Sequence, residues 1–327
     1  MAGFDFSGAI SALKTAHNIC VCGHINPDGD CLGSVMGLTL GLRRLGLNVT
    51  PLLASAEKPR MFDFLEGFDE LVPAREFKTN PDVFVVVDVP DLKRLGDGAA
   101  VLNRAGKVIR IDHHPAPEAI SEITFEDTTA AAAGMLIWEL LGQADVDRSG
   151  SIASWCYTAL VTDTGRFQFQ NADARALNAA AEMVTAGASP NEICTNVYQR
   201  KSLAALKFEA LVAQRLLFAC DGRVALSYIT QQDYVDLDAT TDDSDSLIDY
   251  IRQLDGIEVA IMLREQEDFV RGSIRSKGSK DVAAIAREMN GGGHRAAAGF
   301  TLYEDLEKAK QTVLRLVERS YEPKDGE

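Results

Sequence analysis

The sequence predicts an α/β protein with a doubly wound, mostly parallel N-terminal sheet and a smaller C-terminal α/β domain. In the first half, short apolar runs such as DVFVVVDV at 82–89 alternate with longer segments of helical periodicity. This alternation is typical of β-α-β units and of parallel sheets. The length of 327 residues suits about two domains, each large enough to bury its own core.

Buried strands and helices are expected in turn along the first half. The runs at 18–22, 48–54, 82–89 and 107–111 are apolar and bounded by polar or turn residues, as buried strands are. Helices are expected between or after them, where the apolar residues recur with helical spacing. The expected helices are 33–45, which stops at Gly46, then 129–141 and 152–162.

The second half is expected to be a separate domain. A helical connector is predicted at 189–217, between domains at 1–188 and 218–327. It opens with the helix-start signal SPNE and is not rich in Gly and Ser, so it is no floppy linker. The strands expected beyond it are 224–230, 259–265 and 269–276, and a helix at 282–289 leads into GGGH at 291–294.

The charge and composition limit the classes of partner. A formal net charge of −15 argues against binding of long nucleic acids, which depends on neutralising many phosphates. It leaves room for a small anionic substrate, because metal ions and a local basic patch can reverse the sign inside one cleft. No stretch approaches the roughly 20 apolar residues of a membrane span, and no signal-peptide pattern is visible. We therefore expect a cytoplasmic protein with no membrane partner.

Four of the five histidines lie beside aspartates or glycines. They are His24, His113, His114 and His294. Imidazole nitrogens and carboxylate oxygens together are ligands of divalent transition ions, so a metal enzyme is the simplest interpretation. The six cysteines form no Cys-x-x-Cys pair, and we expect reduced core thiols. Cys31 is expected near the metals without a catalytic role.

The candidate metal ligands follow predicted strands. The turn HINPDGD at 24–30 follows the first strand, Asp88 ends the third, and DHH at 112–114 closes the fourth. Ligands of open α/β sheets gather at these carboxyl ends. With Asp163, the set suffices for two divalent ions that share one carboxylate, which is a device for attacking phosphorus. The six candidate ligands are His24, Asp28, Asp30, Asp88, His113 and Asp163.

Each of these features has a plainer explanation by itself. The turn at 24–30 could consist of Asp caps with an incidental His24, while Asp88 could cap a turn and Asp163 could end a helix. The combination favours metal binding, and an oxygen-rich set with a few imidazoles suits manganese, with Mg²⁺ or Co²⁺ as substitutes.

The motifs, in this order, resemble those of the DHH phosphoesterase superfamily. HINPDGD at 24–30, Asp88 after a valine run, DHH at 112–114 and TDTG at 162–165 carry the resemblance. GGGH at 291–294 resembles the glycine-rich motif of the DHHA1 domain. The resemblance covers nearly the whole chain and departs at no ligand position, although TTAAAAG at 128–134 has fewer hydroxyls than relatives carry.

The resemblance implies a role for each matching residue. His24, Asp28 and Asp88 would hold one manganese, and Asp88 would bridge to a second. The ligands of the second would be Asp30, Asp88, His113 and Asp163. The catalytic group would comprise Asp88, His113, His114 and Asp112. Of these, His114 would contact substrate phosphate and assist the leaving group, and Asp112 would orient the ligands.

The resemblance also implies that the second domain supplies specificity, with the active site in the cleft between the domains. Substrate contacts are expected from Arg264, Arg275, Gly291, Gly292, Gly293 and His294, in addition to His114. Glycines let the backbone approach a phosphate or base closely, and His294 can donate a hydrogen bond. Arg264 and Arg275 could equally belong to a solvated basic face.

Among the branches of the superfamily, the compact two-domain form resembles the bifunctional oligoribonuclease and pAp phosphatase family, the nanoRNases. That implies hydrolysis of very short oligoribonucleotides to mononucleotides, dephosphorylation of pAp to AMP, and a possible homodimer. The alternative substrates are linear pApA and cyclic di-AMP. A non-catalytic nucleotide-binding protein is the alternative of another class, and lost ligands would be its mark.

Overall fold

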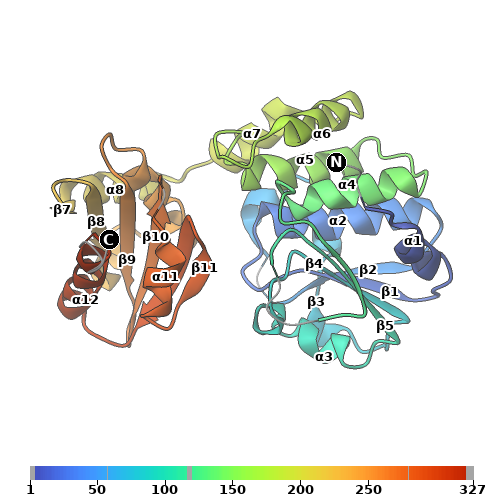
Figure 1. The fold of residues 1–327 in the computed structure, drawn as a ribbon, viewed down its shortest axis with the longest axis horizontal. Coiled ribbons are helices and arrows are strands. Elements are labelled where there is room, and N and C mark those ends of the chain that lie inside the picture. Colours follow the sequence, from blue (N-terminus) through green and yellow to red (C-terminus); the bar gives the residue numbers. More distant parts are fainter. Residues whose placement is uncertain (1–3, 57, 116–119, 279, 322–327) are drawn as a thin grey trace, which may run out of the picture. The chain divides into compact units, whose positions relative to one another are not determined.

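The computed structural model describes residues 4–56, 58–115, 120–278 and 280–321, apart from the side chain of His294. Its contacts divide the chain into two compact units, Met1–Arg200 (unit 1) and Lys201–Glu327 (unit 2). Both units contain a sheet with helices on its faces (Figure 1). The prediction of two successive α/β domains is therefore confirmed.

The sheet of unit 1 has six strands in the order β3-β2-β1-β4-β5-β6, and every neighbouring pair is parallel. The strands are β1 (Ile19–Cys22), β2 (Val49–Leu53), β3 (Val72–Pro73), β4 (Val83–Val87), β5 (Lys107–Asp112) and β6 (Ile123–Glu126). The chain winds outward from β1 to β3 and then returns to start again at β4. The strand order therefore reverses between β1 and β4, where open α/β sheets bind their ligands.

The helices of unit 1 cover both faces of this sheet. They are α1 (Ser7–Lys14), α2 (Gly29–Arg44), α3 (Gly98–Leu102), α4 (Ala133–Gln143), α5 (Ser151–Asp163), α6 (Ala174–Thr185) and α7 (Pro190–Tyr198). The layer that contains α2, α4 and α5 lies over one face, and α3 lies over the other (Figure 1). Alternate residues of β4 serve the two faces: Val85 packs in the core with α2, while Phe84 and Val86 pack in the core with α3.

Two helices begin at residues other than the predicted ones. The helix predicted at 33–45 starts at Gly29, because the Asp28 side chain caps it by accepting a hydrogen bond from the Cys31 N–H. The helix predicted at 129–141 starts only at Ala133, since Ala132 is extended with a φ of −162°. The chain turns at Thr128 and Thr129 and bends at Ala130 and Ala131 before the helix begins, although alanines suit a helix.

The helices α2 and α5 approach each other closely through small residues. A Cβ added at Gly33 would lie 2.5 Å from the Trp155 carbonyl oxygen, and one at Gly29 would lie 2.4 Å from the Thr162 hydroxyl. Glycine at these positions lets the first turn of α2 lie against the last turn of α5. Asp30 and Asp163, which belong to these two turns, are thereby brought to one place.

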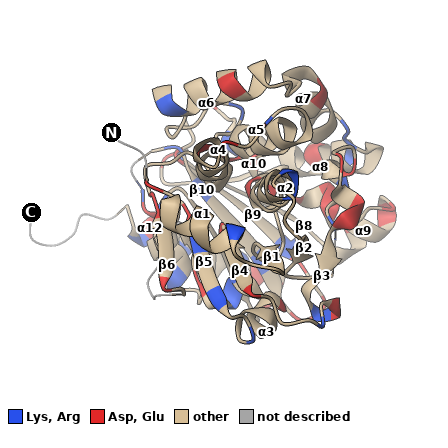
Figure 2. Ribbon diagram, turned by 90° about the vertical axis from the view of Figure 1, so that its right-hand side faces the viewer, with Lys and Arg blue, Asp and Glu red and all other residues tan. Residues whose placement is uncertain are grey.

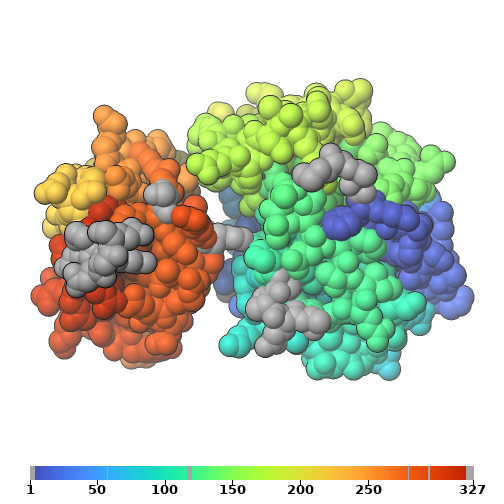
Figure 3. Space-filling view, in the orientation of Figure 1, coloured from blue at the N-terminus to red at the C-terminus, as the bar shows by residue number. Residues whose placement is uncertain are grey.

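Unit 2 contains a mixed sheet in the order β11-β12-β10-β9-β8-β7, in which only the β8–β9 pair is parallel among the described pairs. The strands are β7 (Leu217–Ala219), β8 (Val224–Ile229), β9 (Val259–Glu265), β10 (Val270–Ser276), β11 (Gly292–His294) and β12 (Ala297–Leu302). The short edge strand β7 lies at the surface of the unit (Figure 3).

Helices cover both faces of the second sheet as well. They are α8 (Leu203–Gln214), α9 (Gln231–Asp236), α10 (Leu247–Arg252), α11 (Val282–Arg287) and α12 (Leu306–Arg319). Residues of α8 and α10 pack against one face and residues of α11 and α12 against the other. Acidic residues cluster on α9 and the neighbouring turns (Figure 2), where Asp233 serves as part of a capping box with Thr230.

The predicted connector at 189–217 contains two helices that belong to different units, α7 to unit 1 and α8 to unit 2. The exact domain bounds stay a prediction. No helix in the described part of the chain is long and apolar enough to cross a bilayer.

Candidate metal centre

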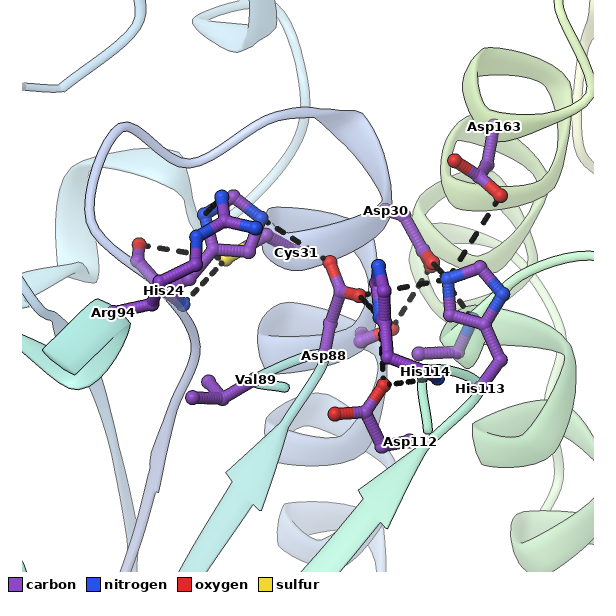
Figure 4. Close-up of polar contacts among 12 residues, drawn as sticks. His24, Asp30, Cys31, Asp88, Val89, Arg94, Asp112, His113, His114 and Asp163 are labelled. Atoms are coloured by element: carbon purple, nitrogen blue, oxygen red, sulfur yellow. Dashed lines mark hydrogen bonds and ion pairs between the residues drawn. The ribbon is translucent and has the colours of Figure 1, made fainter. Parts of the chain in front are cut away.

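Asp88 lies at the centre of a cluster of imidazoles at the carboxyl ends of β1, β4 and β5 (Figure 4). Its Oδ2 is 3.3 Å from His24 Nε2, and its Oδ1 is 3.2 Å from His114 Nδ1 and 3.6 Å from His113 Nε2. The Asp88 backbone has a φ of +55°, a left-handed conformation that is costly for a residue with a Cβ. The turn directly after β4 thus holds the carboxylate between the two neighbouring strand ends.

Asp30 and Asp163 join this cluster from the helices. His113 Nε2 lies 3.5 Å from Asp30 Oδ2 and 3.9 Å from Asp163 Oδ2. Asp30 is buried and accepts hydrogen bonds from the N–H groups of Ala133 (2.7 Å) and Gly134 (2.8 Å) at the start of α4. The start of α4 therefore fixes the Asp30 carboxylate and offers it the positive end of the helix dipole.

Asp28 stands apart from the other predicted ligands. Its side chain is 63% exposed and lies 3.8 Å from His24 Nε2, and its Oδ1 caps α2. Among the described residues, three groups bring potential ligand atoms within 4.8 Å of one another. The groups are His24, Cys31 and Asp88; Asp88, His113 and His114; and Asp30, His113 and Asp163. They contain five of the six predicted ligands, and Asp28 is the sixth.

The donor set fits divalent cations. Asp88 Oδ1 is one of two buried side-chain oxygens in the described residues that have no hydrogen bond. A buried carboxylate oxygen without a hydrogen bond is costly unless a cation or water satisfies it. The cluster contains the carboxylates of Asp30, Asp88 and Asp163 and the imidazoles of His24, His113 and His114. Manganese, magnesium and zinc accept oxygen and nitrogen ligands of this kind.

The protonation of the cluster reflects its crowding. Burial opposes ionisation of Asp88, but the three neighbouring imidazoles outweigh it and hold the pKa of Asp88 well below its ordinary value. Burial likewise opposes protonation of His113, yet contact with Asp88 and the charges of Asp30 and Asp163 raise its pKa to about 11. Burial also raises the pKa of Asp163 to about 7, with Asp28 and Asp88 adding to the shift. Without metal, protons therefore stand in for cations.

Asp112 holds His114 in place. Asp112 Oδ1 accepts hydrogen bonds from both the backbone N–H and the Nδ1 of His114, each at 2.8 Å. Burial disfavours protonation of His114, but these contacts and Asp88 raise its pKa to about 9. The contact between Nδ1 and Asp112 fixes the orientation of the His114 ring.

Sequence reasoning missed three residues around the cluster. Arg110, fully buried, donates to Asp112 (2.8 Å), to Glu126 (2.9 Å) and to the His114 carbonyl (3.0 Å). A charge inside the apolar run 107–111 was the signal. Asn171 Nδ2 donates to the Ala131 and Asp163 carbonyls at 3.0 and 3.1 Å, and no motif marks it. Arg94 Nη2 lies 3.1 Å from His24 Nδ1.

Unit 2 has a basic pocket of about 240 Å³. It is lined by Asp245, Ile248, Arg264, Arg271, Ser273 and Arg275. Arg264 is buried and is held by the Ser244 carbonyl at 2.7 Å and the Ser273 hydroxyl at 3.1 Å. The two predicted substrate-binding arginines, Arg264 and Arg275, are thus brought together, and Arg271, which is not among the predicted contacts, is a third cation in the lining.

Two glycines of the GGGH motif, Gly291 and Gly293, have a structural explanation, whereas a Cβ at Gly292 would meet nothing within 4 Å. A Cβ at Gly291 would lie 2.2 Å from the Gly299 carbonyl, and Gly293 has a φ of +142° with the Ala297 carbonyl 2.4 Å from its would-be Cβ. Gly292 and Gly293 form β11 with His294 and pair with β12. None of the three glycines is among the residues given above as lining the basic pocket. The side chain of His294 lies outside the described part of the structure.

Comparison with known proteins agrees with this layout. Residues 18–162 match the family model described as DHH family, N-terminal domain, and residues 221–319 match the DHHA1 domain. The bifunctional oligoribonuclease and PAP phosphatase NrnA of Thermus thermophilus is 30% identical over 91% of this chain and 89% of its own length. The protein of the same name from Bacillus subtilis is 27% identical over 90% of this chain and 92% of its own.

Solved structures show the same fold. An exopolyphosphatase-related protein from Bacteroides fragilis superposes with a TM-score of 0.91 at 24% identity, covering 96% of this chain and 95% of that one. RecJ from Thermus thermophilus, crystallised with Mn²⁺, has a TM-score of 0.53 at 15% identity and covers 97% of this chain and 56% of its own.

Proposed function

We infer that this chain, which belongs to the DHH family and carries a C-terminal DHHA1 domain, hydrolyses very short oligoribonucleotides to mononucleotides and dephosphorylates pAp to AMP. The observation that carries the proposal is the buried cluster around Asp88, whose Oδ1 has no hydrogen bond. The names of the Thermus and Bacillus relatives, oligoribonuclease and PAP phosphatase, support the choice of substrates.

Two divalent ions, manganese by preference, would be held by the six predicted ligands. His24, Asp28 and Asp88 would hold the first, and Asp30, Asp88, His113 and Asp163 the second. The separation of the ligand atoms into overlapping groups that share Asp88 and His113 supports this division. Asp28 would join from the surface, since it already lies beside His24. The RecJ structure from Thermus thermophilus, which has the same fold, was also obtained in complex with Mn²⁺.

The chemistry that paired divalent ions supply in such a site is activation of water and neutralisation of charge on the phosphoryl group. The residues of the chain would position the reacting groups. Asp112 and Arg110 hold His114 by hydrogen bonds of 2.8 to 3.0 Å, and the ring held in this way would donate a proton to a phosphate oxygen or to the leaving group. The raised pKa of His114, about 9, keeps that proton available at neutral pH.

The basic pocket of unit 2 would bind a terminal phosphate of the nucleotide. Arg264 and Arg275 are both largely enclosed, and burial lowers the pKa of each guanidinium while leaving it charged at neutral pH. A small basic pocket in a chain with a net charge of −15 favours short polyanions over long ones, which need many phosphate contacts. The predicted contacts of Gly291, Gly292, Gly293 and His294 remain part of this proposal.

Hydrolysis by purified protein with added Mn²⁺ tests the proposal. The panel contains RNA dinucleotides to pentamers, a long RNA, pAp, pApA, cyclic di-AMP and pyrophosphate. We expect cleavage of the short RNAs and release of phosphate from pAp, with the long RNA spared. A preference for pApA or cyclic di-AMP would identify these dinucleotides as the substrates, with the same phosphoester hydrolysis. A metal-loaded protein that is inactive on the whole panel would refute the proposal and favour a nucleotide-binding protein.

A further inference from the structure

Arg94 is anchored next to the metal cluster by its own backbone. It lies in the short 3₁₀ helix η4 (Leu92–Leu95), whose cap, Asp91, accepts hydrogen bonds from the N–H groups of Lys93 and Arg94. The Arg94 carbonyl in turn accepts a hydrogen bond of 2.7 Å from the N–H of Ile25. The segment after Asp88 is thereby tied to the segment after β1, and Arg94 lies beside His24 (Figure 4).

The guanidinium of Arg94 differs from that of Arg110, the other arginine of this region. Arg110 forms ion pairs with Asp112 and Glu126. Among the ion pairs of the described residues none includes Arg94, and its side chain contacts His24 Nδ1 at 3.1 Å. An arginine that is partly buried without a carboxylate leaves most of its five donors open to another anion.

The contact with His24 does not explain Arg94. His24 Nδ1 also lies 2.8 Å from the Ile25 carbonyl, which is enough to orient the ring. When His24 Nε2 acts as a ligand, Nδ1 carries the proton and donates it to that carbonyl. Nδ1 and the guanidinium are then both donors, so no hydrogen bond joins them and Arg94 is open to an acceptor.

The charge balance points to an anion as that acceptor. The carboxylates proposed as ligands carry four negative charges, which two divalent ions would neutralise. They are Asp28, Asp30, Asp88 and Asp163. A cation placed beside a metal ligand works against metal binding. The same cation attracts an anionic substrate toward a cluster that would otherwise be neutral.

We propose that Arg94 binds a phosphate oxygen of the substrate at the metal cluster. The planar guanidinium fork matches the oxygens of a phosphate ester, so the group recognised is the scissile or adjacent phosphate of a short nucleotide. This inference rests on the proposed function for its substrate class. It adds a phosphate contact within unit 1 to those expected from unit 2.

The test compares Arg94→Met with Lys93→Met, which removes the same charge from the exposed neighbouring position of η4. The affinities for Mn²⁺ alone, and for inorganic phosphate with Mn²⁺ present, are measured by calorimetry, and KM and kcat are measured with pAp. We expect Arg94→Met to weaken phosphate binding and raise KM about tenfold or more, as loss of a charged hydrogen bond does. Its Mn²⁺ affinity should be unchanged or higher, and Lys93→Met should match the wild type.

If Arg94 served only to orient His24, its replacement would weaken Mn²⁺ binding instead of leaving it unchanged or stronger. Weaker Mn²⁺ binding by Arg94→Met, or unchanged phosphate binding, would overturn the proposal. Arg94→Lys keeps the positive charge but loses the guanidinium fork, so its affinity for phosphate should fall several-fold. This variant provides the test if Arg94→Met does not fold. Because phosphate binding is measured without turnover, failure of the proposed activity and failure of this inference are told apart.

Discussion

Asp88 is the residue on which the proposed chemistry depends. It is buried, has a left-handed backbone, and contacts three imidazoles from two neighbouring strand ends. Such strain persists when the surrounding structure over-determines it, and it concentrates at functional sites. The sequence marked Asp88 because it ends a run of valines, but the conformation that aims its carboxylate could not be inferred from that run.

The pH dependence of metal binding follows from the residues around Asp88. The pKa of His113 is raised from 6.5 to about 11 in the metal-free protein. Protonation of His113 therefore stabilises this state fully below pH 6.5, and the stabilisation is lost as the pH rises through about 11. As a metal ligand, His113 would have to be a neutral imidazole, so Mn²⁺ would displace its proton throughout the neutral range.

We therefore expect Mn²⁺ affinity to rise by about tenfold per pH unit between pH 7 and 8, for one proton displaced. The rise should be steeper below pH 7, where Asp163, whose pKa is about 7, also holds a proton. Calorimetric titrations in buffers of different ionisation enthalpy measure both the affinity and the protons released. A Mn²⁺ affinity that is constant from pH 6 to 8 would contradict this assignment.

At the scale of elements, the contact between α2 and α5 holds together the two predicted ligands that lie on helices. Asp30 and Asp163 come from opposite ends of these helices in sequence, and Gly29 and Gly33 permit the close approach. The helical pattern of both segments is visible in the sequence. The sequence does not reveal that α4 starts at Ala133, where its N–H groups fix Asp30, because the alanines at 130–132 suit a helix as well as a turn.

Gly33→Ala should destabilise unit 1 by about 1–3 kcal/mol, since its methyl group would lie 2.5 Å from the Trp155 carbonyl. Urea unfolding followed by tryptophan fluorescence reports on this unit alone, because both tryptophans of the chain, Trp138 and Trp155, belong to it. The control is Gly8→Ala in α1, whose added Cβ meets nothing within 4 Å. Equal unfolding midpoints for the two variants would show that α2 and α5 are not tightly packed.

At the scale of the whole molecule, the pattern of the sequence was enough for the two-unit α/β fold and for five of the six predicted metal ligands, whose side chains the structure brings close together. Strand alternation predicts parallel pairing, and parallel pairing brings the carboxyl ends of β1, β4 and β5 together. What the pattern could not supply were contacts made by single polar residues at long sequence separation. Asn171 reaches Ala131 across 40 residues, and Arg94 reaches His24 across 70, with no local spacing to reveal them.

The same limit applies to unit 2. The charge of Arg264 and Arg275 and their place on strands predict substrate contacts, and both residues line one pocket. Arg271 lines it too, because β9 and β10 are antiparallel neighbours in which Arg271 lies opposite Arg264. That register depends on the turn between the strands, and the strand pattern alone leaves it open.

The most direct test of the account is the number of Mn²⁺ ions bound per chain, measured by equilibrium dialysis for the wild type and for Asp88→Asn, together with hydrolysis of pAp. We expect two ions per wild-type chain. Loss of the shared carboxylate charge should leave at most one tightly bound ion and lower kcat by about 10²-fold or more, the scale at which loss of a key electrostatic group acts. An Asp88→Asn protein that binds two ions and turns over pAp at a near-normal rate would contradict the central role of Asp88.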